Sequence, residues 1–183
     1  MAEHNRASER PPMLTGMFRD RDSAERAYAS MVNRGYARDD VTLLMSEEAR
    51  RRHFGDGRES ELGSKAEEGA AVGAVVGGGL GAVLLGLAAA GTIALPGLGL
   101  IAMGPLAAAL TGGAVGAATG GILGALIGAG IPEEQARQYE TGIREGNIVM
   151  GVTPRSDEDA QYFENEWRNY RGEQIYRPTR RAA

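Results

Sequence analysis

The stretch from Gly69 to Ile131 constrains the fold of this chain most strongly, because it contains no charged residue, no histidine and no side-chain amide. Its only polar side chains belong to threonines. A contiguous apolar surface of this size does not stay exposed to water, since it would drive association or aggregation. The stretch must therefore be buried in lipid, within the protein or against other copies of the chain.

Glycine recurs at every fourth position in two parts of this stretch. On an α-helix that spacing places the glycines in one nearly straight stripe without side chains. Two such stripes can approach closely enough for dispersion and weak Cα–H···O contacts to hold the helices together. The sequence thus predicts an antiparallel helical hairpin over residues 65–131, with helix–helix packing at Gly69, Gly73, Gly77, Gly81, Gly112, Gly116, Gly120, Gly124 and Gly128.

The predicted hairpin has one helix over about residues 66–90, a connection over residues 91–104 and a second helix from Pro105 to Ile131. Pro96 and several glycines interrupt the helical pattern in the connection, whereas proline is compatible with the first turn of a helix. At 1.5 Å per residue, a helix from residue 69 to residue 90 would be about 33 Å long. That length matches the hydrocarbon thickness of a bilayer.

All of the charged residues lie outside the apolar stretch, so the chain divides into unlike parts. We expect a disordered arm at residues 1–12, the first half of an α/β domain with a linker at 13–64, the apolar helical hairpin at 65–131, the second half of the domain at 132–177 and a basic tail at 178–183. The two halves can form one domain, since an antiparallel hairpin returns the chain to the side from which it left.

Four short runs outside the hairpin predict strands, at residues 13–18, 41–45, 148–153 and 174–176. Helical patterns lie between the first two strands, after the second, before the third and between the last two. The order is therefore β-α-β, then a helix, then β-α-β. It predicts an α+β fold, namely a ferredoxin-like α/β sandwich interrupted by the glycine-zipper hairpin.

Capping residues mark the ends of the predicted helices. Asp22, with Glu25 three residues later, would form a capping box at the start of the first helix, and Gly35 fits a left-handed cap at its end. Ser46 and Ser156 would cap two later helices. The side chains expected to face the core follow helical spacing: Ala24, Ala27, Tyr28 and Met31; Ala136, Tyr139 and Ile143; Ala160, Phe163 and Trp167.

Several runs of the chain together match the pattern of a known family. They are Met13-Leu-Thr-Gly-Met-Phe18 with Asp20, Asp22 and Ala24, Met45-Ser-Glu-Glu-Ala-Arg-Arg-Arg-His-Phe54, Gly104-Pro-Leu-Ala107, and Gly130-Ile-Pro-Glu-Glu134 with Tyr139 and Gly142. They resemble the bacterial general stress protein (YflT-like) family of heat-induced stress proteins over about residues 13–153. The resemblance implies a bacterial protein connected with stress responses and brings no set of catalytic residues.

No group of side chains predicts a catalytic, cofactor-binding or metal site. The chain has no cysteine, and its histidines are His4 in the predicted arm and His53 in a basic run. The acidic pairs at residues 47–48, 67–68 and 133–134 stand at predicted helix starts, where the helix dipole accounts for them. Neither glycine-rich run of the form G-x-G-x-x-A follows a predicted strand, as a dinucleotide loop would require. We therefore expect neither an enzyme nor a cofactor.

Composition also limits the partners. The formal net charge of -4 argues against nucleic acid, which needs clustered lysines and arginines, and no small-molecule substrate is indicated. The apolar hairpin instead indicates membrane lipid and other copies of the chain. Basic residues that flank it would stay on the cytoplasmic side of a membrane.

These observations predict a non-enzymatic bacterial stress-response protein. Its cytoplasmic α/β domain would be carried on a membrane-embedded hairpin that self-associates at the cytoplasmic membrane. The alternative is a soluble cytoplasmic homo-oligomer, a structural protein whose hairpins bury one another; a lone hairpin in water is not expected, since each interior glycine costs about 1 kcal/mol relative to alanine. A third interpretation, an enzyme or small-ligand sensor, requires a convergent polar cluster that the sequence does not show.

Overall fold

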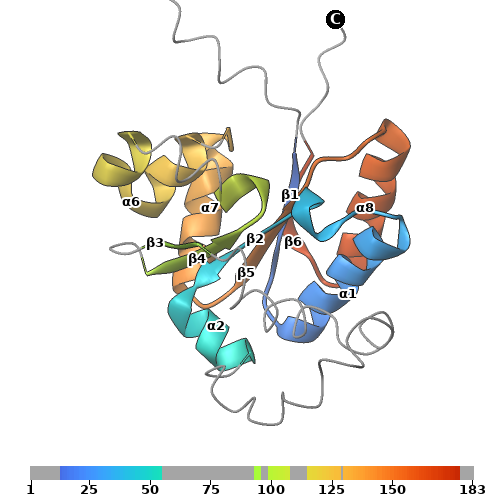
Figure 1. Cartoon of the computed structure of the whole chain (residues 1–183), viewed down its shortest axis with the longest axis horizontal. Helices are drawn as coiled ribbons and strands as arrows, with labels where there is room; N and C mark the ends of the chain where they lie inside the picture. The colour runs from blue at the N-terminus through green and yellow to red at the C-terminus, as the bar shows by residue number, and fades with distance from the viewer. Residues whose placement is uncertain (1–12, 55–92, 96–98, 108–114, 129, 178–183) are drawn as a thin grey trace, which may run out of the picture.

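The computed structural model describes residues 13–54, 93–95, 99–107, 115–128 and 130–177. Within these ranges the chain has a mixed α+β fold around one antiparallel sheet of six strands, in the order β3-β4-β2-β5-β1-β6 (Figure 1). The strands are β1 (Leu14–Phe18), β2 (Val41–Ser46), β3 (Ile93–Leu95), β4 (Leu100–Met103), β5 (Ile148–Val152) and β6 (Glu173–Tyr176). The helices are α1 (Arg21–Asn33), the short 3-10 helix η2 (Arg38–Asp40), α2 (Glu47–Phe54), α6 (Val115–Gly128), α7 (Glu133–Arg144) and α8 (Asp157–Asn169).

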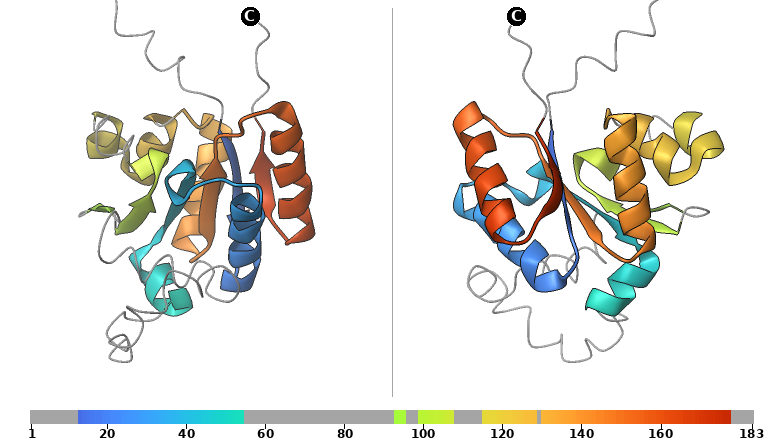
Figure 2. Two further views of the ribbon diagram at one scale, coloured as in Figure 1. Left: turned by 45° about the vertical axis from the view of Figure 1, so that its right-hand side comes forward. Right: turned by 180° about the vertical axis from the view of Figure 1, so that it is seen from behind.

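The centre of the sheet is β5, which pairs antiparallel with β1 on one side and with β2 on the other. Helix α1 connects β1 to β2, and α8 connects β5 to β6, so each helix links two strands that have another strand between them. Helices α1 and α8 lie side by side on one face of the sheet, while α6 and α7 cover the other (Figure 2). Both faces are therefore buried, which explains why every residue of β1 and β5 is buried.

The core between the sheet and helices α1 and α8 is rich in aromatic side chains. The rings of Phe18 and Trp167 meet edge to face with their centroids 5.7 Å apart, and those of Tyr36 and Phe163 do so at 5.0 Å. Such pairs contribute about 0.5–1.5 kcal/mol beyond the area that they bury. The core positions predicted for the first and last helices are confirmed as buried: Ala24, Ala27, Tyr28, Met31, Ala160, Phe163 and Trp167.

The local predictions for the charged parts of the chain are largely confirmed. All four predicted strands are present, with ends shifted by a residue at most, and so are the four helices. Gly35 has φ 80°, and the side chains of Ser46 and Ser156 accept hydrogen bonds from the amides of residues 49 and 159. The prediction of Asp22 as the first helix cap is wrong. Asp20 is the cap, because Arg21 is already helical and the amide that needs an acceptor is that of Ser23.

A second core lies on the other face of the sheet, and it contains residues from the apolar stretch. Its side chains come from β1, β2, β4, β5, α6, α7 and the residues that follow β4 and α6. The buried members are Met17, Leu44, Leu100, Ala102, Leu106, Ala107, Ile122, Leu126, Ile131, Ala136, Tyr139, Ile143 and Val149. They include the predicted face Ala136, Tyr139 and Ile143 of the helix before β5. A substantial part of the apolar sequence is thus buried against the protein's own sheet.

The prediction that residues 91–104 only connect two helices is wrong. Ile93–Leu95 and Leu100–Met103 are paired strands, and β4 also pairs with β2, with Leu43 opposite Met103 and Ser46 opposite Leu100. Along β4 the side chains alternate, so Ile101 and Met103 join the first core, whereas Leu100 and Ala102 join the second. A short apolar run of this kind cannot be assigned to strand or helix by its pattern alone.

The second predicted hairpin helix is not continuous over residues 105–131. Helix α6 begins at Val115, is kinked at Gly121, where φ is 60° and ψ is -145°, and ends at Gly128. The kink separates Gly116 and Gly120 from Gly124 and Gly128, so these glycines do not form the single straight stripe that the spacing predicted. Among the described residues no helix combines the length and the apolar character needed to cross a membrane.

Other predictions concern parts of the chain that the structure does not describe. They are the first hairpin helix with Gly69, Gly73, Gly77 and Gly81, the glycine at position 112 (Gly112), the arm 1–12, the linker 55–64 and the tail 178–183. For these residues the expectations from the sequence stay predictions.

Candidate functional site

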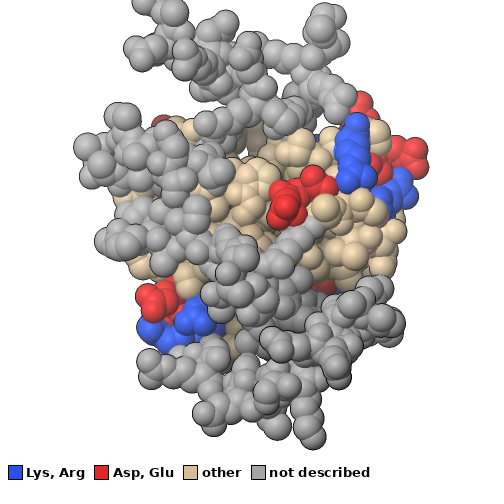
Figure 3. All heavy atoms as spheres, viewed as in Figure 1, with Lys and Arg blue, Asp and Glu red and all other residues tan. Residues whose placement is uncertain are grey.

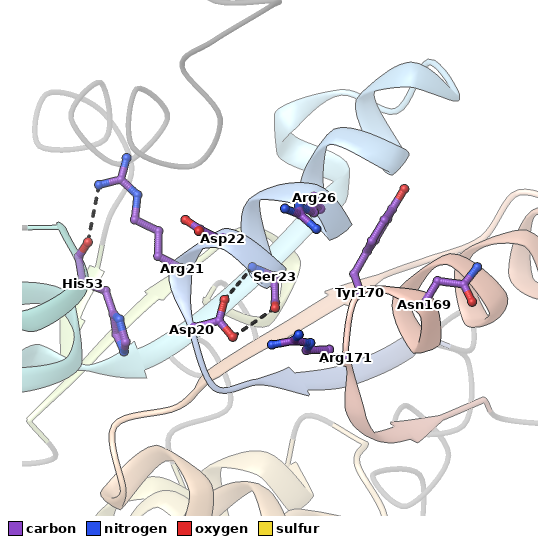
Figure 4. Close-up of a pocket in the computed structure, with 9 residues that line it drawn as sticks. All are labelled: Asp20, Arg21, Asp22, Ser23, Arg26, His53, Asn169, Tyr170 and Arg171. Carbon is purple, nitrogen blue, oxygen red and sulfur yellow. Dashed lines mark hydrogen bonds between the residues drawn. The ribbon is translucent and has the colours of Figure 1, made fainter.

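A hollow of about 530 Å³ lies where the start of α1, the end of α2 and the end of α8 meet (Figure 4). Three separated segments of the chain line it, and most of the side chains are polar or charged. They are Asp20, Arg21, Asp22, Ser23, Arg26, His53, Asn169, Tyr170 and Arg171. This hollow is the convergent polar cluster that the sequence did not show.

Asp20 shapes one wall of the hollow. Its Oδ1 atom accepts a hydrogen bond from the Ser23 amide at 2.8 Å, and its Oδ2 atom accepts one from the Ser23 hydroxyl at 3.0 Å. Both carboxylate oxygens are therefore used to hold the first turn of α1, the usual role of an aspartate at a helix N-cap. Asp22 lies two residues after Asp20, in the first turn of α1, and is exposed.

The opposite wall is formed by the turn that ends α8. The amide of Gly172 donates to the carbonyl of Trp167 at 2.7 Å, and the amide of Arg171 donates to that of Arg168 at 3.1 Å, a Schellman motif. In this motif the residue after the cap is left-handed and is usually glycine. Here it is Arg171, with φ 60°.

The glycine of this turn is the next residue, Gly172, where space rather than backbone conformation requires it. A Cβ atom at Gly172 would lie 2.7 Å from the Trp167 carbonyl oxygen and 3.1 Å from a ring carbon of Phe18. The backbone of Gly172 therefore approaches too closely for a side chain. Arg171 takes the left-handed conformation at a cost of about 1–2 kcal/mol, and its side chain lies in the lining of the hollow.

The arginines of the hollow differ in how they are held. Arg21 is fixed, because it donates to Glu25 at 2.6 Å and to the His53 carbonyl at 3.4 Å and lies over the Phe54 ring. Arg26 and Arg171 form no ion pair within the ranges that the structure describes. They are thus the two arginines of the hollow that no described carboxylate holds, although Asp20 and Asp22 line the same hollow.

His53 makes a contact that holds two elements together. Its Nε2 atom lies 3.0 Å from the carbonyl oxygen of Gly146, half-buried, and a carbonyl can only accept, so Nε2 carries the proton. The contact joins the end of α2 to the turn before β5. Tyr170 is also engaged, since its hydroxyl donates to Glu166 at 2.5 Å, and this hydrogen bond to a carboxylate raises the pKa of Tyr170.

The other charged side chains are mostly matched in pairs. On the face shown in Figure 3, acidic and basic side chains lie next to one another rather than in separate patches. The predicted acidic starts of α2 and α7 pair with arginines one turn later, as in Glu47 with Arg51 and Glu133 with Arg137. Within the described chain no three acidic or histidine side chains come together as metal ligands.

A second polar cluster joins the end of α1 to the start of α8. The Tyr36 hydroxyl donates to Asp159 at 2.6 Å and accepts from the Arg155 amide at 2.7 Å, while Arg34 donates to Asp159 at 2.8 Å. The hydrogen bonds from Tyr36 and Arg34 lower the pKa of Asp159, and burial raises the pKa of Tyr36. This cluster therefore ties the end of α1 to the start of α8.

The predicted packing glycines are only partly placed. Gly116, Gly120, Gly124 and Gly128 lie in α6, but a Cβ added at Gly128 would meet no described atom within 4 Å. A close helix contact at that position is thus not formed by the described residues. The residues of the hollow were missed because three distant segments supply them, and no motif in the sequence connects those segments.

Comparison with protein-family models, with curated proteins and with solved structures gives no match to this chain. The resemblance to bacterial general stress proteins therefore rests on the sequence runs alone.

Proposed function

We propose that this chain is a non-enzymatic bacterial stress-response protein with a ferredoxin-like domain that carries an apolar segment for association with the membrane. The neighbours β2-β5-β1-β6, all antiparallel, with α1 and α8 together on one face, support the ferredoxin-like arrangement. Strands β3 and β4 extend this sheet beyond β2, and α6 and α7 cover its second face.

The observation that carries the proposal is the division of the apolar stretch. Its second part is buried against the sheet through residues such as Leu100, Leu106 and Leu126, each at most 2% exposed, so these side chains are unavailable to lipid. Residues 69–90 have no polar side chain at all. In a helix they are long enough for the hydrocarbon layer. We therefore assign lipid association and self-association to this segment, at the bacterial cytoplasmic membrane with the α/β domain in the cytoplasm.

Flotation of the full chain with liposomes tests the assignment. The wild-type chain should float, and Leu80→Asp should not, because a charge at the middle of a membrane segment costs about 2.5–3.5 kcal/mol. Ile127→Asp is the matched control: this side chain on α6 is 40% exposed, and the substitution should leave flotation unchanged. Loss of flotation with both variants, or with neither, would contradict the assignment.

The alternative is a soluble homo-oligomeric structural protein. Burial of the second part of the stretch within the protein favours it, since this apolar sequence does serve as protein core. Recovery of the wild-type chain as a discrete oligomer without detergent, together with failure to float, would establish this alternative. In either case Gly77→Leu should weaken crosslinking between copies and Leu84→Ile should not, because only the former places a side chain on the predicted stripe.

A further inference from the structure

We propose that the hollow between α1, α2 and α8 binds the phosphate group of a small phosphorylated molecule, with Arg26 and Arg171 as the groups that hold it. This goes beyond the function proposed above, and neither depends on the other. It is carried by the geometry of the hollow and by the charges that line it.

The two arginines have the chemistry that a phosphate requires. A guanidinium group is planar, stays charged and can donate two parallel hydrogen bonds to phosphate oxygens. Arg26 comes from α1 and Arg171 from the turn after α8, so they reach the hollow from different elements (Figure 4). Neither forms an ion pair with the described residues, whereas Arg21 beside them is held by Glu25. Both guanidinium groups can therefore donate to a ligand anion.

The conformation of Arg171 adds a second reason. The turn requires glycine at position 172 because a side chain there would not fit. At position 171 the backbone is left-handed, so glycine would be less strained there than the arginine that is present. An outlier of this kind is a reason to look for function at that residue. The left-handed backbone holds the start of the Arg171 side chain at the hollow.

Size and lining indicate the rest of the ligand. A volume of about 530 Å³ is in the usual range for small-molecule sites and exceeds what a lone phosphate needs. The Tyr170 ring also lines the hollow and can contact an organic group attached to the phosphate. The class is therefore a phosphate ester of a small organic molecule.

Two acidic side chains, Asp20 and Asp22, also line the hollow and bear on its affinity for phosphate. Both oxygens of Asp20 already accept hydrogen bonds from Ser23, so this carboxylate belongs to the helix cap. Asp22 is exposed and would repel an anion. The substitution Asp22→Asn should thus strengthen phosphate binding several-fold.

Titration calorimetry on the full chain tests the proposal, with inorganic phosphate and adenosine 5′-monophosphate as probes. The nucleotide should bind more tightly than inorganic phosphate, and Arg171→Gly and Arg26→Gln should each weaken binding by about tenfold or more, the usual effect of losing a charged hydrogen-bond partner. Arg171→Gly also removes the backbone strain, so its melting temperature should equal or exceed that of the wild type. Loss of binding in a variant that is not destabilised cannot be attributed to unfolding.

Arg137→Gln on α7 is the matched control, because it removes the same charge from an exposed ion pair on the other face of the sheet. It should bind both probes as the wild type does. Equal binding by the wild type, Arg171→Gly and Arg26→Gln would overturn the proposal, as would the absence of binding to either probe and to anionic lipid.

Vesicles identify the source of the phosphate. In the Leu80→Asp chain, which should not enter lipid through its apolar segment, binding of phosphatidylglycerol vesicles that Arg171→Gly abolishes, without binding of the soluble probes, would assign the site to a lipid headgroup and retain its phosphate chemistry. Binding of the soluble probes alone would assign it to a free metabolite. Leu80→Asp should change flotation without changing binding of the soluble probes, so failure of this proposal and failure of the proposed function are distinguishable.

Discussion

The two faces of the sheet are built from different kinds of sequence. Helices α1 and α8 cover one face, and both come from charged parts of the chain, with polar caps and an ion-paired junction through Arg34 and Asp159. The other face is covered by α7, which is charged, and by α6 and the residues after β4, which come from the apolar stretch. Both faces bury a core. A buried core can therefore form both from helices with charged residues and polar caps and from a stretch that is almost entirely apolar.

This difference shows what periodicity can and cannot predict. On α1 and α8 the polar residues mark the exposed side, so the buried side follows from the spacing. In the apolar stretch nearly every residue could be inside, and neither the face nor the type of secondary structure is marked. Substitutions on both faces test this comparison, in order of decreasing expected effect: the first three concern the second face, and the last two concern α1 and its junction with α8.

Gly104→Ala should have the largest effect. Gly104 has φ 77°, and a Cβ there would lie 2.0 Å from the Val41 carbonyl oxygen, so β4 could not keep its place beside β2. Left-handed strain and overpacking together should lower the free energy of unfolding by about 3–5 kcal/mol. Gly99→Ala is the matched control, since Gly99 is also left-handed but has open space around it; about 1 kcal/mol is expected. Urea denaturation measures both, and equal losses would contradict the pairing of β4 with β2.

Leu126→Ala should lower the free energy of unfolding by about 2–5 kcal/mol, because Leu126 is fully buried under α7 and the sheet. Ile127→Ala, one position along the same helix, should cost less than about 1 kcal/mol, because that side chain is 40% exposed. Thermal or chemical denaturation of both variants compares them. Similar small losses would mean that α6 does not contribute to the core that it shares with α7.

Tyr139→Phe probes polar contacts inside the second core. The Tyr139 hydroxyl lies 2.8 Å from both the Thr15 hydroxyl and the Gln174 carbonyl, so it donates to the carbonyl and accepts from Thr15. Burial raises the pKa of Tyr139 well above its usual value. Removing the hydroxyl should cost about 1–2 kcal/mol, because Thr15 is left buried without this partner.

Tyr162→Phe is the control for that substitution. Its hydroxyl makes no hydrogen bond to the described residues, so a change within about 0.5 kcal/mol is expected. If the two variants lost the same stability by denaturant unfolding, the buried hydrogen bonds of Tyr139 would contribute nothing.

Asp20→Ala tests the corrected helix cap on the first face. Loss of the bond to the Ser23 amide should cost about 1 kcal/mol. Asp22→Ala should cost only a few tenths of a kcal/mol through the helix dipole. The reverse order in a denaturation experiment would restore the capping box that the sequence predicted.

The smallest effect concerns pH and the junction between α1 and α8. Tyr36 and Arg34 hold the pKa of Asp159 below its usual range, so the folded state binds the proton more weakly than the unfolded state does. The stabilisation is thus fully present above about pH 4 and is lost as the pH falls through the lowered value. The wild type should exceed Asp159→Asn in stability at pH 7, and the difference should vanish in acid. A difference that stays constant with pH would contradict this role of Asp159.

The parts of the fold that could be predicted are those in which polar residues carry information. Helix α8 follows from the cap Ser156 and the buried face that ends at Trp167. Strand β5 is itself apolar, but Gly146 and Asn147 before it and Thr153 and Pro154 after it mark its ends. Strand β4 could not be recognised, because Leu100 to Met103 is apolar throughout and its partner β2 is distant in sequence. The hollow could not be predicted for a similar reason, since Arg26 and Arg171 are distant in sequence and line one hollow only in the folded chain.

Hydrogen exchange at β4 tests the central claim most directly, namely that part of the apolar stretch is a strand of the domain's own sheet. Strand β4 lies between β2 and β3, so its amides should be protected to a degree similar to those of β2 and β5. Exchange of residues 100–103 in the native protein as fast as in an unfolded chain would contradict the account.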